Sequence, residues 1–152
     1  MSAQLRCQEL MQELGPSMAE IEWLIQESER SWSIGYAGEM ELGISFCASP
    51  DRLLLSAIIG QPEEADRQSI YTAMLCSNLL YAEAQALRIA LTGPEGDLML
   101  LSEMVPADWT LTEISEAISR FSATTQHFVE GLSLSMEELI AIPPSINASA
   151  RV

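Results

Sequence analysis

Lysine is missing from this 152-residue chain, and its seven basic residues, all arginine, stand against 22 acidic residues. The formal net charge is −15. Nucleic acids and anionic lipid surfaces bind proteins through clustered basic residues, whereas these arginines stand singly along the chain. The composition therefore argues against both partners. Acidity keeps a chain with 48% hydrophobic residues soluble, and it also favours the approach of a basic partner.

Cysteine and histidine are scarce as well. The three cysteines, Cys7, Cys47 and Cys76, lack the spacing of a metal site, and we expect them to be small buried hydrophobic residues in a reducing cytosol. The single histidine, His127, would need a reactive thiol beside it for nucleophilic catalysis, but Cys47 and Cys76 lie in apolar runs that disfavour the thiolate. The sequence predicts no enzyme activity, no metal site and no cofactor.

Long apolar runs are also absent. The first 14 residues have neither a basic start nor a continuous apolar stretch, so we expect the chain to stay in the cytoplasm. No segment reaches the roughly 18 uninterrupted apolar residues of a membrane span. We expect one domain over residues 1–142. Residues 143–152, rich in Pro, Ser and Ala, are expected to form a disordered tail.

The most apolar segment present is SIYTAMLCSNLLYAEAQAL, residues 69–87. Wound as a helix it carries apolar residues on every side, with Met74, Leu79 and Leu80 on three different faces. Such a helix must be covered on both sides, and a chain of this length has little material for two thick layers. A second copy of the chain is the simplest cover, which predicts a homodimer.

The remaining patterns predict an α+β fold with an antiparallel twisted sheet and three helices. An amphipathic helix over residues 3–14 is expected to stop at Gly15-Pro16. Alternating apolar residues predict strands at 31–38, 41–48 and 52–60, and turn residues between them favour a meander. A turn-rich segment at 92–96 joins two further strands, at 87–91 and 97–105, into a hairpin.

Two more segments complete the pattern. Thr110 and Glu113 have the spacing of a capping box, and the apolar stripe that follows predicts a helix to about residue 132. Residues 17–29 allow two interpretations. Ser17 and Glu20 could cap a helix, whereas Ile21, Trp23 and Ile25 alternate as in a strand. We favour the strand, in which Trp23 could contact a partner.

The order of helix, three strands, helix, hairpin and helix resembles the class I chaperones of bacterial type III secretion, the Tir chaperone family. Two stretches carry the resemblance. The central apolar helix has an Asn before it leads into a strand, as in MLCSNLLYAEAQALRIAL with Asn78. A strand then ends at an apolar-proline turn before an amphipathic helix with a central Phe, as in MLLSEMVPADWTLTEISEAISRF with Pro106 and Phe121.

The resemblance implies a homodimeric bacterial chaperone that binds the extended N-terminal region of a secreted effector and keeps it soluble and ready for export, without ATP. The resemblance also allows the secretion ATPase as a second partner. Family members dimerise through the central helix and the next strand, which here implies Leu75, Leu79, Tyr81, Leu87 and Ile89. The effector lies over grooves of the first helix and the sheet, which implies Leu10, Leu14, Trp32, Ile34 and Leu42.

A regulatory protein of the same fold, which binds a transcription factor or signalling partner, is the alternative. The chain has more apolar surface than it can bury alone, and this by itself also favours a protein that binds extended apolar chains.

Overall fold

The computed structural model describes residues 1–82 and 87–132, except for the side chains of residues 80–82. These residues form two compact units. Unit 1 consists of residues 1–57 and 103–122, and unit 2 of residues 58–102 and 123–132. The predicted tail, 143–152, lies outside the described residues. Within the described ranges, every helix is too short or too polar to cross a membrane.

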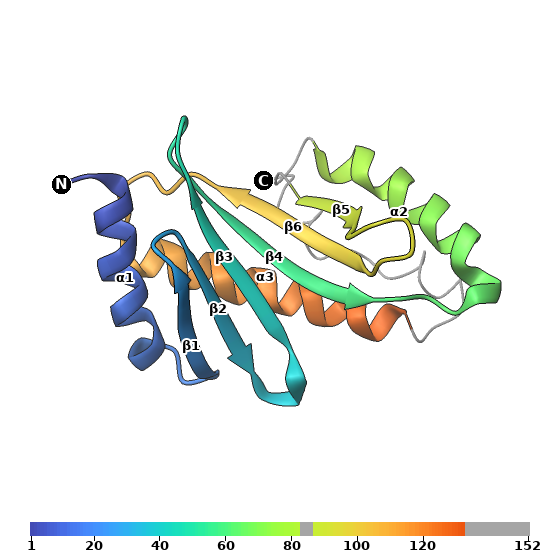
Figure 1. The fold of residues 1–152 in the computed structure, drawn as a ribbon, viewed down its shortest axis with the longest axis horizontal. Helices are drawn as coiled ribbons and strands as arrows, with labels where there is room; N and C mark the ends of the chain where they lie inside the picture. The colour runs from blue at the N-terminus through green and yellow to red at the C-terminus, as the bar shows by residue number, and fades with distance from the viewer. Residues whose placement is uncertain (83–86, 133–152) are drawn as a thin grey trace. The chain divides into compact units, whose positions relative to one another are not determined.

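The described residues form three α-helices and six strands (Figure 1). The sheet order is β1-β2-β3-β4-β6-β5. The predicted antiparallel α+β fold is therefore confirmed, and the favoured strand interpretation of residues 17–29 is confirmed by β1. The elements are α1 (Ala3–Ser17), β1 (Ile21–Ser28), β2 (Ser31–Tyr36), β3 (Glu41–Cys47), β4 (Arg52–Gly60), α2 (Arg67–Ala82), β5 (Leu87–Leu91), β6 (Leu98–Met104) and α3 (Leu111–Gly131).

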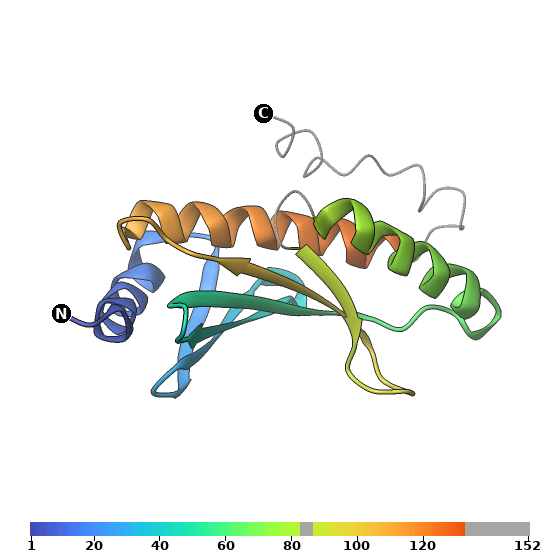
Figure 2. The same cartoon turned by 90° about the horizontal axis from the view of Figure 1, so that it is seen from above.

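Strand pairing in unit 1 aligns the apolar residues of the meander on one face of the sheet. Trp32 pairs with Ile44 and Ile34 with Leu42, and all four side chains are buried. The opposite face of β2 and β3 carries glycine and serine residues. Figure 2 shows the first half of α3 along one side of these strands. Alternation in the sequence thus separates a covered face from a barer one.

Helix α1 begins at the Ser2 cap, whose hydroxyl accepts a hydrogen bond from the Leu5 amide at 3.2 Å. Its apolar stripe is buried. The prediction that Gly15-Pro16 stops this helix is wrong, because α1 runs to Ser17. Pro16 lacks an amide donor but lies only one residue before the end of the helix, and the Met18 amide closes the helix by donating to the carbonyl of Leu14 at 3.1 Å.

Helix α3 begins with the predicted capping box. The Glu113 amide donates to the Thr110 hydroxyl, and the Glu113 carboxylate accepts from the Thr110 amide, both at 3.2 Å. The same carboxylate accepts the amides of Ala107 and Asp108. These bonds, first of all that from the Thr110 amide, lower the pKa of Glu113, while desolvation partly opposes them. One carboxylate therefore binds three backbone amides of the connection from β6 to α3.

In unit 2 the predicted hairpin is confirmed, since β5 and β6 pair antiparallel with Leu87 opposite Ser102 and Leu91 opposite Leu98. Helix α2 packs along β5 (Figure 1). Its side chains Ile70 and Met74 are buried.

The expectation that all three cysteines are buried is correct for Cys7 only. Burial raises the pKa of the Cys7 thiol to about 12. Cys47 is half-buried at the end of β3, and Cys76 is exposed on α2. Apolar neighbours in sequence misled the prediction, because consecutive residues of a helix or strand face different sides.

Candidate functional site

The groove between α1 and β1 is the first candidate site. It encloses about 440 Å³ and belongs wholly to unit 1. Figure 1 shows α1 beside β1, the last strand of the sheet order on this side. The α1–β1 groove is lined by Met11, Gln12, Gly15 and Pro16 of α1, by Ile21, Glu22, Trp23, Leu24 and Gln26 of β1, and by Trp32 of β2.

Trp23 is held in place by a glycine on the neighbouring strand. It pairs with Gly35 across β1 and β2, and a Cβ atom at position 35 would overlap its indole ring. The absence of that atom lets the indole lie flat on the β2 backbone. Trp23 nevertheless remains 38% exposed. A large rigid aromatic surface thus lines the groove and stays partly exposed, which suits contact with a partner.

Strand β1 is irregular at both ends of the groove. Its pairing with β2 shifts between Ile21 and Trp23 and again between Gln26 and Ser28. The first shift removes Ile21 from the regular alternation with Trp23 and Ile25 that the sequence indicated. Ile25, 51% exposed, continues the apolar surface of Trp23 along the strand. Trp23 pairs with Gly35 and Ile25 with Ser33, so both exposed apolar residues lie on the barer face of the sheet.

The residues that the resemblance implied for effector binding lie mainly in the interior of unit 1. Leu10, Leu14 and Ile34 have no exposed surface, Leu42 has 1% and Trp32 has 3%. Trp32 alone of the five lines the α1–β1 groove, where it forms part of the floor. The other four are buried and do not line the groove, so the exposed residues around it are the better contact candidates.

The second candidate site is the outer face of α2, in unit 2. Leu75 is 68% exposed and Leu79 is 76% exposed, one helical turn apart. They are among the most exposed large apolar side chains of the described residues. Leu87 and Ile89, also implied for the dimer contact, are 3% and 5% exposed and lie in the core of unit 2. Tyr81 belongs to α2, and its side chain lies outside the described part.

Asn78 joins α2 to β5 and so fixes the direction in which this face points. Its side-chain amide donates to the Ile89 carbonyl at 2.9 Å, and its side-chain oxygen accepts from the Ile89 amide at 2.7 Å. The side chain thereby occupies the position of a neighbouring strand at the outer edge of β5. The Asn noted in the apolar helix therefore has a physical role. It bonds to the amide and the carbonyl of Ile89, which would cost free energy if they were buried without partners.

The sequence did not predict Gly35 as a site residue, and it indicated Trp23 only as a residue that could contact a partner. Both sit on neighbouring strands, and their contact depends on the register of β1 against β2. The available signal was a strand with a tryptophan next to a strand that alternates Trp, Ile and Tyr with Ser and Gly. Within the described residues, no three His, Cys, Asp or Glu side chains are placed to hold a metal ion.

Comparison with known proteins agrees with this architecture. Structures from two complexes share the fold at 16% identity. A chain titled as part of the HopA1-SchA chaperone-effector complex has a TM-score of 0.64, with 84% of this chain and 96% of that chain covered. A chain from the ExsC-ExsE complex has a TM-score of 0.62, with 94% and 100% covered. No curated protein sequence matches.

Residues 28–128, more than half of the chain, match the family model described as the Tir chaperone protein (CesT) family. The match includes β2 to β6 and most of α3, and so includes the strand that carries Gly35 and the helix that carries Asn78. The chain belongs to the Tir chaperone protein family.

Proposed function

We propose that this protein is a cytoplasmic bacterial chaperone that binds the extended N-terminal segment of a type III secretion effector. The α1–β1 groove carries the proposal. It combines an edge strand, a hollow of about 440 Å³ lined by both apolar and polar side chains, and a tryptophan fixed by its neighbour strand. An extended chain can pair with an edge strand through its main chain while its side chains enter the hollow. Such binding tolerates differences in effector sequence, because main-chain bonds are common to all peptides.

The family and its fold support the same activity. One structural neighbour comes from a complex titled chaperone-effector, and the groove here would give the effector an apolar surface in place of water. Burial of apolar surface contributes about 25 cal/mol for each Å² removed from water. Binding energy alone then keeps the effector segment unfolded and soluble, and we expect no requirement for ATP.

We further propose that the working form is a homodimer built on α2. Among the described residues, Leu75 and Leu79 form an exposed apolar pair on a helix whose other side packs on β5. Contact between two copies of this face would remove both leucines from water, at about 1.5–3 kcal/mol for each fully buried side chain. Leu87 and Ile89 would support this contact from within rather than form it.

Size-exclusion chromatography with light scattering tests both proposals. The purified chain should elute at about twice its mass of 16.7 kDa, and co-expression with effector N-terminal fragments should yield a heavier complex. A monomer would contradict the α2 interface. A dimer that retains none of the effector fragments, but retains a transcription factor or signalling protein from the same gene neighbourhood, would favour the regulatory alternative.

The groove has its own test. Trp23→Ala should lower the affinity for a retained fragment, whereas Leu5→Ala should not, because Leu5 is 53% exposed on α1 outside the groove. Equal affinities of the two variants would show that the fragment binds elsewhere.

A further inference from the structure

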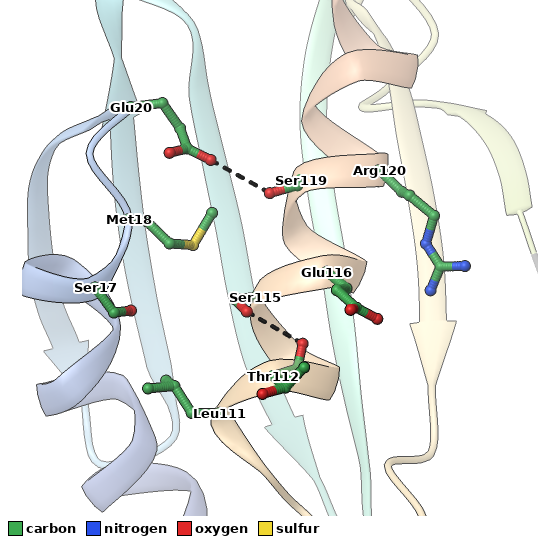
Figure 3. Close-up of a pocket in the computed structure, with 9 residues that line it drawn as sticks. All are labelled: Ser17, Met18, Glu20, Leu111, Thr112, Ser115, Glu116, Ser119 and Arg120. Carbon is green, nitrogen blue, oxygen red and sulfur yellow. Dashed lines mark hydrogen bonds between the residues drawn. The ribbon is translucent and has the colours of Figure 1, made fainter.

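A second hollow lies in unit 1, between the end of α1 and the outer face of α3. It encloses about 540 Å³. Figure 3 shows Ser17, Met18 and Glu20 on one side and six residues of α3, from Leu111 to Arg120, on the other. We call it the α1–α3 hollow. The proposed function does not use it, and no sequence motif marked it.

The hollow has an apolar part. Met18, 5% exposed, and Leu111 line it beside the polar groups. In Figure 3 the Met18 side chain extends from the end of α1 toward α3. A long side chain with an aliphatic stem could lie over these two residues and keep its polar end near the opening.

Three of the four hydroxyl groups that line the hollow donate hydrogen bonds within the protein. Ser17 donates to the Leu14 carbonyl at 2.8 Å and Ser115 to the Thr112 carbonyl at 3.1 Å. Ser119 donates to the Glu20 carboxylate at 3.3 Å (Figure 3). A hydroxyl has a single proton but two acceptor lone pairs. With their protons committed inside the protein, these three hydroxyls present acceptors to any ligand.

The charged groups of the lining also favour a ligand that donates hydrogen bonds. Glu20 and Glu116 line the hollow, and an ionised carboxylate only accepts hydrogen bonds. The Ser119 bond also orients the Glu20 carboxylate. Arg120 is the one cationic side chain of the lining, and it is exposed on α3, where it makes an interaction of its own. Carboxylates and acceptor-only hydroxyls together suit a group with several N–H donors and no acceptor, which describes a guanidinium.

The hollow adjoins the α1–β1 groove along the chain. The groove lining ends at Pro16 and resumes at Ile21, and the hollow lining takes Ser17, Met18 and Glu20 from the segment between them. A peptide that leaves the groove over this connection would therefore meet the hollow next. From this placement and from the excess of acceptors, we propose that the α1–α3 hollow binds an arginine side chain of the effector segment held in the groove. This inference rests on the proposed function.

A small probe tests the hollow without an effector. N-acetyl-arginine amide is titrated into the isotope-labelled protein, with N-acetyl-citrulline amide as a control of the same shape whose urea group is neutral. The arginine probe should move the backbone amide resonances of residues 17–20 and 112–120, and the citrulline probe should move them at least about fivefold less at equal concentration. Equal shifts from both probes would overturn the proposal.

Matched variants tie the effect to the carboxylate. Glu20→Gln should abolish most of the arginine-induced shifts, and Ser119→Ala should reduce them by freeing the orientation of Glu20. Glu64→Gln removes the same charge in unit 2 and should leave them unchanged. Undiminished shifts in Glu20→Gln would contradict the assignment.

An effector fragment that is retained in the light-scattering experiment extends the test. Glu20→Gln should weaken its binding about fivefold relative to Glu64→Gln. Unchanged binding would overturn the role of the hollow and leave the groove intact. If every fragment fails to bind, the proposed function fails, while the small probe still decides whether the hollow takes a guanidinium.

Discussion

The two strands that end the sheet order differ in what lies beside them. At β5 the outer edge is occupied by Asn78, which bonds to both main-chain groups of Ile89, and the Leu87 carbonyl accepts the Arg88 guanidinium at 2.9 Å. At β1 the neighbour is the α1–β1 groove, with Trp23 and Ile25 exposed. Side chains that cap an edge prevent strand addition. We therefore propose β1, rather than β5, as the edge that receives an incoming chain, and the helix over β5 as the site of the contact between two copies.

The largest expected effect is on the α2 face beside the capped edge. Leu79→Asp places a carboxylate in the proposed contact between two copies, where its desolvation should cost about 3 kcal/mol or more and weaken the dimer roughly a hundredfold. Sedimentation over a concentration series measures this change.

Ser69→Asp is the matched control, because Ser69 is exposed in the first turn of α2, where a negative charge is tolerated. A Leu79→Asp protein that stays as dimeric as this control would place the interface elsewhere.

The cap on β5 is tested by Asn78→Leu, which keeps the size of the side chain but removes both bonds to Ile89. Because Ile89 is only 5% exposed, its amide and carbonyl would lose their partners in a dry environment. The free energy of unfolding should fall by about 2–4 kcal/mol, measured by urea denaturation, and the Ile89 amide should exchange faster with solvent.

Ser77→Ala serves as the neighbouring control, since its hydroxyl bonds only to the Ala73 carbonyl of its own helix. If the two variants were equally stable, Asn78 would not be what holds α2 on β5.

The role of the β1 edge is tested by two substitutions, both of which act on the indole of Trp23. Trp23→Ala should weaken effector binding by about 2 kcal/mol, roughly 30-fold, with little loss of stability because the ring is partly exposed. Gly35→Ala should weaken binding in the same direction, because the added Cβ would displace the ring. Isothermal titration with a retained fragment measures both.

An effect of Trp23→Ala without an effect of Gly35→Ala would mean that the ring contributes apolar surface but that its position is not set by β2.

The smallest expected effect concerns pH. The folded protein lowers the pKa of Glu113 below its ordinary value of 4.5, so the carboxylate stabilises the fold when ionised. This contribution is present above pH 4.5 and is lost as the pH falls through the lower folded pKa. The stability difference between the unchanged protein and Glu113→Gln should therefore be constant near neutral pH and shrink in acid. A difference that grows in acid would contradict this sign.

Most of the fold follows from local patterns. The capping box at Thr110 and Glu113, the hairpin around residues 92–96 and the alternating meander each depend on residues close in sequence, so their outcome could be predicted. The end of α1 was misjudged because Gly15 and Pro16 stand inside its last turn rather than after it. Residues 17–29 were ambiguous because capping and alternation signals overlap there.

The candidate surfaces needed the tertiary structure. Apolar residues such as Leu10, Ile34 and Leu79 look alike in a sequence, yet the first two are fully buried and the third is 76% exposed. The sequence determined that the central helix is apolar on every side and that the chain is acidic. Only the folded chain decided which of its sides β5 covers, that Asn78 bonds to Ile89, and that Trp23 rests on Gly35. Periodicity states which face of an element is apolar, whereas what covers that face depends on packing between residues distant in sequence.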